Sequence, residues 1–183
     1  MKKVCYTAVT GNYDKVVDPI VVTPGFDYIC FTDRPFSSNI WKCLPIPSEL
    51  QWLSNVKKQR VLKICPHRFL KEYDLSVWID GNISVVGRLD EFVQQYDFKD
   101  GTFFSRVHPS RNCIYDEAEA CMRYKKDSAS IIEKQIKRYR EEGYPAKAGM
   151  VETCILLRLH NELECKMIDD AWAVELLNES HRD

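Results

Sequence analysis

The hydrophobic positions of this chain fall into short runs that alternate between two spacings along its 183 residues. Short runs rich in β-branched and aromatic residues predict strands, and an apolar stripe repeating every ~3.6 residues predicts a helix. The predicted strands are residues 2–9, 27–31, 41–44, 75–79, 83–86, 102–107 and 150–159. The predicted helices are residues 54–70 (with a break at Pro66), 89–96, 114–126, 128–142 and 163–178. Strands that alternate with helices in this way predict an α/β fold with a mostly parallel sheet.

The predicted strand 75–79 is apolar throughout, which suits a strand covered on both faces. It stops at Asp80-Gly81-Asn82, where the glycine permits a tight bend. Ligands of open α/β sheets bind outside the carboxyl ends of strands, so Asp80 and Asn82 could hold a hydrated divalent cation or a sugar hydroxyl. The alternative is an ordinary β-turn, because Asp-Gly-Asn is good turn chemistry in any protein.

Polar residues also follow the first two predicted strands. Residues 2–9 run into Thr10-Gly11-Asn12-Tyr13-Asp14, and residues 27–31 run into Thr32-Asp33. Hydroxyl and carboxylate groups at these positions could bind a ribose or the edge of a base. Thr and Asp also cap turns frequently, which is the structural alternative for both segments.

The predicted helix at 54–70 carries a dense group of basic side chains, and the first acid after them is Glu72. The members are Lys57, Lys58, Arg60, Lys63, His67, Arg68 and Lys71. A diphosphate would be bound well by such a surface, because guanidinium and ammonium groups donate charged hydrogen bonds to phosphate oxygens. A solvated helix face is the alternative.

Composition narrows the function classes. Hydrophobic content of 45% and charged content of 29% are those of a soluble globular domain, and a net charge of -1 argues against a general nucleic-acid binder. The chain shows neither a signal-peptide core nor a stretch able to span a bilayer, so we expect a cytoplasmic protein that meets a membrane only through a larger assembly. The eight cysteines include no Cys-x-x-Cys pair, which predicts reduced thiols and no structural zinc.

A series of motifs resembles the nucleotide-sugar glycosyltransferases of the GT-A fold, and most closely the glycosyltransferase-like family formerly called domain of unknown function 616. The matching segments are YTAVTGNYD at 6–14, FTDRP at 31–35, KICPHRFL at 63–70, VWIDGNISV at 77–85, HPSRNCIYDEAEAC at 108–121, EGYPAKAGMVET at 142–153 and RLHN at 158–161. The resemblance implies one GT-A-like (Rossmann-like) domain over residues 1–183, with a mixed, mostly parallel sheet flanked by helices. The chain ends on Ser180-His181-Arg182-Asp183, a cluster of ionisable groups that we interpret as a C-terminal truncation.

The resemblance also implies a role for each motif. Thr10, Gly11, Asp14 and Asp33 would line the nucleoside pocket, and Arg60 and Lys63 would face the diphosphate. Asp80 and Asn82 would stand at the Asp-x-Asp position that binds Mn²⁺ or Mg²⁺, although the amide of Asn82 is a weaker ligand for a hard cation than a carboxylate. The residues implied at the donor sugar and the acceptor are His108, Arg111, Glu152, His160 and Asn161. Glu152, Arg182 and Asp183 are the catalytic candidates, and Asp183 is a possible base.

The resemblance therefore implies transfer of a sugar from a nucleotide-sugar donor, a UDP-sugar, to a glycan or lipid-linked acceptor. Asn82 at the Asp-x-Asp position supports an alternative, a non-catalytic nucleotide-sugar-binding module. A hydrolase is a third interpretation, suggested by the four histidines together with Asp80 and Glu152. The chain lacks the Gly-x-Ser-x-Gly and His-Glu-x-x-His motifs of common hydrolases, which disfavours it.

Overall fold

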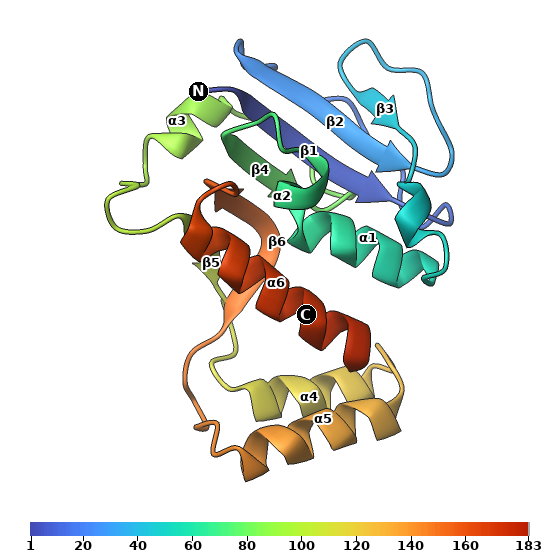
Figure 1. The fold of residues 1–183 in the computed structure, drawn as a ribbon, viewed down its shortest axis with the longest axis vertical. Helices are drawn as coiled ribbons and strands as arrows, with labels where there is room; N and C mark the ends of the chain where they lie inside the picture. Colours follow the sequence, from blue (N-terminus) through green and yellow to red (C-terminus); the bar gives the residue numbers. More distant parts are fainter. Residues whose placement is uncertain (183) are drawn as a thin grey trace.

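A computed structural model describes residues 1–182; Asp183, proposed above as a base, lies outside the described residues. The strands are β1 (Lys3–Val9), β2 (Phe26–Thr32), β3 (Lys42–Leu44), β4 (Leu75–Ile79), β5 (Phe103–Val107) and β6 (Val151–Arg158). The α-helices are α1 (Asn55–Ile64), α2 (Pro66–Phe69), α3 (Leu89–Val93), α4 (Ile114–Arg123), α5 (Ala129–Glu141) and α6 (Leu163–Asn178). Figure 1 shows their arrangement.

The six strands form one sheet in the order β3-β2-β1-β4-β6-β5. β1 pairs in parallel with β2 and β4, β2 pairs in parallel with β3, and β6 is antiparallel to both of its neighbours. The prediction of a mixed, mostly parallel sheet flanked by helices is therefore confirmed, and the architecture is consistent with a Rossmann-like GT-A fold. The chain proceeds from β1 outward to β3 and then returns to the other side of β1 as β4. The switch point of the sheet, where ligands bind in such folds, thus lies between the carboxyl ends of β1 and β4.

Alternate residues of the central strands pack into two cores. Tyr6 and Trp78 face the side covered by α1 and α6, and their rings meet edge to face at 5.1 Å. Cys5 and Val77 face the opposite side, which is covered by α3 and loop segments. Both faces are buried, as predicted from the apolar run at 75–79, so the polar residues that follow β4 appear where the chain leaves the core.

A buried ion pair joins the last strand to the last helix. Arg158 Nη1 donates to Asp169 Oδ1 at 3.0 Å, and both side chains are fully buried. The second guanidinium nitrogen, Nη2, donates to the hydroxyl of Tyr6 and to the backbone oxygen of Lys63. These contacts hold β6, α6, α1 and β1 in one block, because the guanidinium fork satisfies several acceptors that would otherwise be buried without a donor.

The predicted strand at residues 83–86 is wrong. The segment is a loop that folds back under the sheet, where the backbone oxygen of Val85 accepts hydrogen bonds from the amides of Ile20 at 2.9 Å and Val21 at 3.2 Å. Val85 itself is buried in the second core. The segment is apolar because it covers one face of the sheet, not because it pairs with a strand. Hydrophobicity alone does not distinguish a covering loop from a strand.

The helices α4 and α5 form a pair with a small core of their own, built on Ala118, Cys121, Ile132 and Ile136. Figure 1 shows this pair beyond the C-terminal end of α6, on the side of the sheet that carries β5 and β6. Within residues 1–182, which include all eight cysteines, every cysteine is a free thiol, as predicted. No helix of the described chain has the length and apolar character needed to cross a membrane.

Candidate functional site

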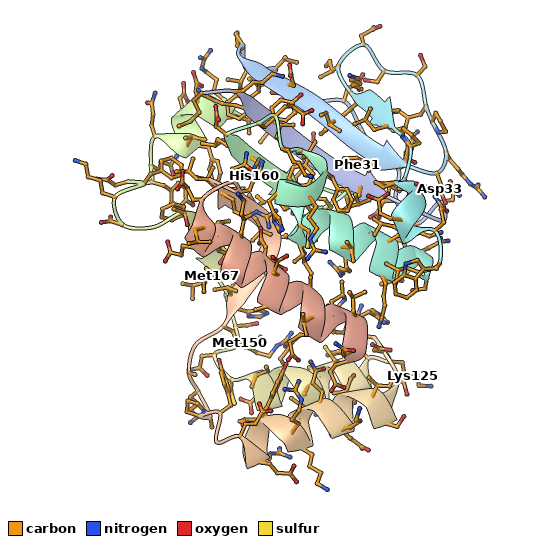
Figure 2. The ribbon with its side chains drawn as sticks, viewed as in Figure 1. Phe31, Asp33, Lys125, Met150, His160 and Met167 are labelled. Carbon is orange, nitrogen blue, oxygen red and sulfur yellow. The ribbon has the colours of Figure 1, made fainter. Side chains whose placement is uncertain are left out.

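A cleft of about 740 Å³ lies at the carboxyl ends of β1 and β4, the position predicted from the strand-end residues. Its walls come from the segment after β1, the turn after β4, helix α1, the α4–α5 connection and residues 181–182. Of the predicted site residues, those that line it are Thr10, Gly11, Asp14, Arg60, Asp80, Asn82 and Arg182. Figure 2 labels Asp33, which follows β2, and Lys125, in the α4–α5 connection, on the same side of the molecule.

Two donors fix the carboxylate of Asp80 on the floor of the cleft. The indole Nε1 of Trp78 donates to Asp80 Oδ1 at 2.9 Å, and the ammonium of Lys63 lies 3.5 Å from the same oxygen. Lys63 is 1% exposed and also donates to the hydroxyl of Thr153 at 2.9 Å. Lys63 thus lies beneath the floor, against Asp80, and is not among the residues that line the cleft where a diphosphate was expected to meet it.

A second carboxylate, Asp14, lies beside Asp80. Burial raises the pKa of the Asp14 carboxyl, and the negative charge of Asp80 raises it further. Gly81 allows this approach, because a Cβ there would stand 3.3 Å from Asp14 Oδ2 and 2.6 Å from a methyl carbon of Val9. Two adjacent carboxylates repel each other, and a divalent cation with oxygen ligands relieves that repulsion. The residues present therefore fit Mn²⁺ or Mg²⁺, with Asp14 supplying a second carboxylate that the Asn82 position lacks.

Two hydrogen bonds to neighbouring segments hold the loop after β1 in place. Thr10 Oγ1 donates to the backbone oxygen of Asn55 at 2.7 Å, at the start of α1. The amide of Gly11 donates to Asp33 Oδ2 at 2.9 Å. Gly11 has a φ of +65°, and a Cβ there would stand 2.5 Å from the end of the Asn55 side chain, so the position favours glycine. Thr10 and Asp33 thus shape the loop, and Asp33 acts from outside the set of residues that line the cleft.

Positive side chains surround the two acids. The basic residues that line the cleft are Arg60, Lys125, Lys126, His181 and Arg182. A floor of carboxylates under a basic rim is suited to a metal-bound diphosphate, because the phosphate oxygens bind the rim and the metal binds the floor. Sequence reasoning missed Tyr124, Lys125 and Lys126, which stand at the end of the helix predicted at residues 114–126. The basic pair at the end of that helix was the available signal.

Asp127 fastens the C-terminal segment to the α4–α5 connection. Its Oδ2 accepts from Ser180 Oγ at 2.7 Å and from the His181 amide at 2.8 Å, and the His181 ring nitrogen Nδ1 lies 2.9 Å away. Burial alone would raise the pKa of Asp127, but the hydrogen bonds from Ser180 and from backbone amides outweigh it and lower that pKa. The ionised Asp127 therefore fixes the segment that carries Arg182, which lines the cleft and whose side chain also forms a hydrogen bond with Cys121.

Glu152 interacts with Cys154 beside a β-bulge and is not among the residues that line the cleft. The pairing of β5 with β6 jumps from Ser105–Leu156 to Arg106–Glu152, and within the jump the backbone oxygen of Cys154 accepts from the Asp80 amide at 2.9 Å. Burial raises the pKa of the Cys154 thiol, with further contributions from the charges of Glu152 and Asp80. Bulges of this kind often redirect side chains next to functional sites.

Other predicted residues lie elsewhere. His108 Nδ1 accepts from the amides of Ser110 at 3.2 Å and Arg111 at 3.0 Å, which organises the turn after β5. His160 and Asn161 were expected at the donor sugar or acceptor, but they follow β6, which runs antiparallel to β4, so they lie at the opposite end of the sheet. There His160 Nε2 donates to the Leu70 oxygen at 3.0 Å, and Asn161 donates to the Tyr73 oxygen at 2.7 Å.

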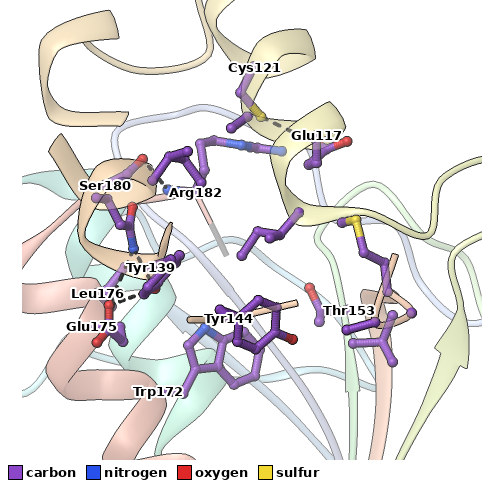
Figure 3. Close-up of a pocket in the computed structure, with 18 of the residues that line it drawn as sticks. Glu117, Cys121, Tyr139, Tyr144, Thr153, Trp172, Glu175, Leu176, Ser180 and Arg182 are labelled. Atoms are coloured by element: carbon purple, nitrogen blue, oxygen red, sulfur yellow. Dashed lines mark hydrogen bonds between the residues drawn. The ribbon is translucent and has the colours of Figure 1, made fainter. Parts of the chain in front are cut away.

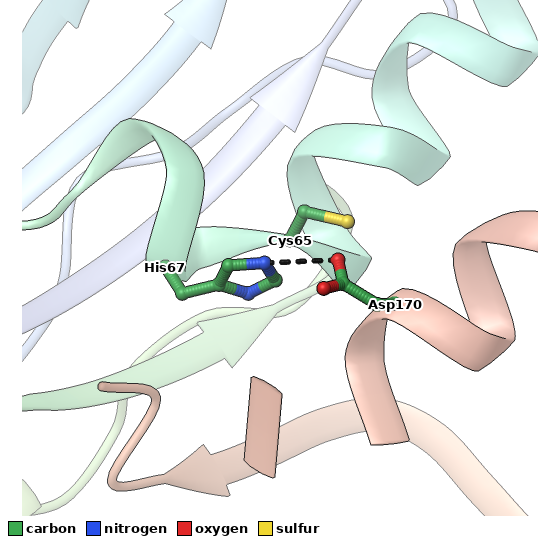
Figure 4. Close-up of side chains that lie close together, drawn as sticks. All are labelled: Cys65, His67 and Asp170. Carbon is green, nitrogen blue, oxygen red and sulfur yellow. Dashed lines mark hydrogen bonds and ion pairs between the residues drawn. The ribbon is translucent and has the colours of Figure 1, made fainter. Parts of the chain in front are cut away.

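The four histidines do not gather in the cleft, where only His181 contributes to the lining. Within residues 1–182, the His, Cys, Asp and Glu side chains close enough to share a metal ion are Cys65, His67 and Asp170, whose ligand atoms lie within 4.8 Å of one another (Figure 4). Asp170 already accepts from His67 Nε2 at 3.1 Å and from Arg68. The group thus ties α2 to α6, away from the cleft, and gives no support to the hydrolase interpretation.

Comparison with known proteins identifies the family. The family model of the TOD1/MUCI70 glycosyltransferase-like domain matches residues 31–168, which include Arg60, Asp80 and the basic α4–α5 connection. The chain therefore belongs to this family, the one that its motifs resemble. A protein described as probable hexosyltransferase MUCI70, from Arabidopsis thaliana, is 26% identical over an alignment of 130 residues that covers 66% of this chain and 22% of that protein. The aligned part of the chain spans about a fifth of that relative's length.

Proposed function

We propose that this chain transfers a sugar from a nucleotide-sugar donor, a UDP-sugar, to an acceptor hydroxyl. The observation that carries the proposal is the pair of carboxylates, Asp14 and Asp80, on the floor of a cleft whose rim is basic. A nucleotide alone needs the rim, and a metal alone needs the floor, whereas a metal-bound nucleoside diphosphate uses both. The family and the hexosyltransferase relative support the same class of reaction.

Each group of residues has a separate task in this proposal. Asp80 and Asp14 would hold Mn²⁺ or Mg²⁺, which neutralises charge on the leaving nucleoside diphosphate. Arg60 and Arg182 would donate hydrogen bonds to the phosphate oxygens, together with the lysines of the α4–α5 connection. The loop from Thr10 to Asp14, shaped by Asp33, would lie against the nucleoside.

The chemical step needs one proton acceptor. The acceptor oxygen forms a bond to the anomeric carbon of the sugar while the bond from that carbon to the diphosphate oxygen breaks, and its electron pair leaves with the nucleoside diphosphate. The hydroxyl proton passes to a base if the reaction inverts the anomeric centre. We propose Glu152 for this base among the described residues, because its carboxylate and that of Asp80 both lie near enough to Cys154 to raise the pKa of that thiol; Asp183 remains a candidate outside them.

Isothermal titration with UDP, with and without Mn²⁺, tests the donor site. We expect UDP to bind when Mn²⁺ is present, and we expect Asp80→Asn or Asp14→Asn to weaken binding by at least about tenfold, since each removes a charged ligand worth ~1.4 kcal/mol or more. Glu72→Gln is the matched control, because it removes an exposed acid at the opposite end of β4. Absence of UDP binding in both conditions would refute the proposal.

A non-catalytic nucleotide-sugar-binding module is the second candidate, favoured by the exposed amide Asn82 where an acid is expected. It predicts that a UDP-sugar binds but releases no UDP, with or without an acceptor. Release of UDP from UDP-glucose or UDP-galactose, measured in the wild-type protein and in Asn82→Asp, separates the two. Turnover by the wild-type protein would exclude the binding module.

A further inference from the structure

A second cavity, of about 680 Å³, lies between the α4–α5 pair and the sheet edge with α6 (Figure 3). Aliphatic side chains such as Ile132 and Leu176 form much of its wall, and Trp172 and Tyr144 add aromatic surface. Ligand pockets commonly have volumes of about 300–1,000 Å³ and are mostly apolar with a few placed polar groups. The cavity therefore has the size and the wall chemistry of a binding site.

Two features connect this cavity with the cleft at the carboxyl ends of β1 and β4, called the donor cleft below. Arg182 lines both spaces. Thr153 lines the second cavity and accepts a hydrogen bond of 2.9 Å from Lys63, whose ammonium lies 3.5 Å from Asp80 Oδ1. A molecule in the second cavity with a hydroxyl beside Arg182 would thus present that hydroxyl at the wall that the cavity shares with the donor cleft.

The acidic groups in the wall of the cavity already have partners. Glu175 Oε2 accepts from the Tyr139 hydroxyl at 2.7 Å, from Gln135 at 3.3 Å and from Arg138. Glu117, another acid of the wall, forms an ion pair with Arg111. A sugar ring buried there would find few groups for its hydroxyls, and unsatisfied buried hydroxyls are costly. A hydrocarbon chain needs no such partners and gains from leaving water.

Apolar residues around the cavity also remain exposed. Val107 is 75% exposed, Val151 is 51% exposed and Tyr144 is 47% exposed, and all three belong to its lining. An occupant with an apolar body would cover these side chains as it entered. The lining has exposed apolar side chains, and its acidic groups already pair with other side chains of the protein. Both features disfavour a hydroxyl-rich glycan as the occupant of the cavity.

We infer that this cavity binds the hydrocarbon part of the acceptor, and that the hydroxyl to be glycosylated lies beside Arg182, at the wall shared with the donor cleft. The inference rests on the proposed function and specifies its acceptor class: an alcohol or glycoside that carries an alkyl chain. Arg182 then stands between the two substrates, at the shared wall of the two spaces.

Titration with octyl β-glucoside, below its micelle concentration, against glucose as the reference tests the inference with UDP and Mn²⁺ present. We expect the octyl compound to bind at least about tenfold more tightly than glucose, because several buried methylene groups contribute. Ala148→Trp should fill the cavity from an exposed loop position and abolish that difference. Ala146→Trp, in the same exposed loop but outside the lining, should retain it.

UDP binding of the same variants separates this inference from the donor site. If UDP binds but octyl β-glucoside binds no better than glucose, the acceptor inference is wrong while the proposed function stands. Equal affinity of Ala148→Trp and the wild-type protein for the octyl compound would also overturn it. Loss of octyl β-glucoside binding in Ala148→Trp, with unchanged UDP binding, would support it. A faster release of UDP from UDP-glucose with octyl β-glucoside than with glucose would support the placement of the hydroxyl.

Discussion

Trp78 and Asp80, two residues apart at the end of β4, are joined by a hydrogen bond of 2.9 Å from the indole Nε1 to Oδ1. The indole is fully buried, so its position is set by the core rather than by solvent-exposed loops. Lys63 approaches the same oxygen from α1. The orientation of the carboxylate is therefore determined by the packed interior, which is the arrangement expected of a preorganised site.

Trp78→Phe should weaken Mn²⁺-dependent UDP binding about five- to tenfold, because the loss of a hydrogen bond to a carboxylate costs ~1–1.5 kcal/mol. The aromatic contact with Tyr6 is retained in kind by the phenyl ring. Trp52→Phe is the matched control, since Trp52 is 76% exposed. Isothermal titration measures the effect, and an unchanged affinity in Trp78→Phe would show that the indole does not orient Asp80.

Gly81→Ala should destabilise the protein by roughly 1–3 kcal/mol and displace the turn, because the new Cβ would stand 2.6 Å from a methyl carbon of Val9 in a packed region. Gly87→Ala provides the control, since a Cβ at Gly87 has no heavy atom within 4 Å. Urea denaturation gives the free energy of unfolding, and UDP titration gives the functional effect. Equal stability of the two variants would contradict the tight contact between the turn and β1.

Asp127→Ala should lower UDP affinity by about tenfold without unfolding the domain, because Ser180 and His181 lose their shared acceptor and Arg182 is no longer held at the wall of the cleft. Asp116→Ala removes an exposed acid from α4 and should leave the affinity unchanged. Titration of UDP with Mn²⁺ compares the two. If both variants bind UDP like the wild-type protein, the C-terminal segment has no part in donor binding.

The order of strands and helices was predictable from the sequence because each element carries its own periodicity. The placement of Asp14 and Asp80 in one cleft was predictable as well, because the carboxyl ends of parallel strands meet at one edge of the sheet. The presence of Lys125 and Lys126 in the wall of the cleft was not predictable. It depends on how the α4–α5 pair packs against the rest of the domain, and the sequence of neither helix specifies that orientation.

The burial of Lys63, Arg158 and His160 also could not be predicted from the hydrophobic pattern of the residues around them. The basic residues around Lys63 suggested that its side chain contacts solvent or phosphate. Instead its ammonium contacts Asp80, which follows β4, and Thr153 of β6. His160 was expected at the donor sugar or the acceptor, but it is buried against the backbone oxygen of Leu70, and Arg158 of the same strand is buried against Asp169 of α6. In each case the deciding partner is distant in sequence.

His160 predicts a pH dependence of stability. Burial lowers the pKa of this imidazole from 6.5 to about 4 in the folded protein, where Nε2 donates to Leu70 and Nδ1 has no partner among the described residues. The unfolded chain binds the proton more readily, so the contribution of His160 is fully present above pH ~6.5 and is lost as the pH falls from there to ~4. The loss reaches about 3 kcal/mol, at ~1.4 kcal/mol per pH unit.

Urea denaturation at several pH values between ~6.5 and ~4.5 measures this slope. Asp127, Asp170 and Glu175, whose pKa values are lowered in the fold, lose their contributions only below their ordinary values, which are 3.8 for the two aspartates and 4.5 for Glu175. His160→Gln should therefore flatten the slope in this window, and His108→Gln, at the opposite end of β6, should preserve it. A slope that is unchanged in His160→Gln would mean that the imidazole is not held neutral by burial, and that another group accounts for the acid sensitivity.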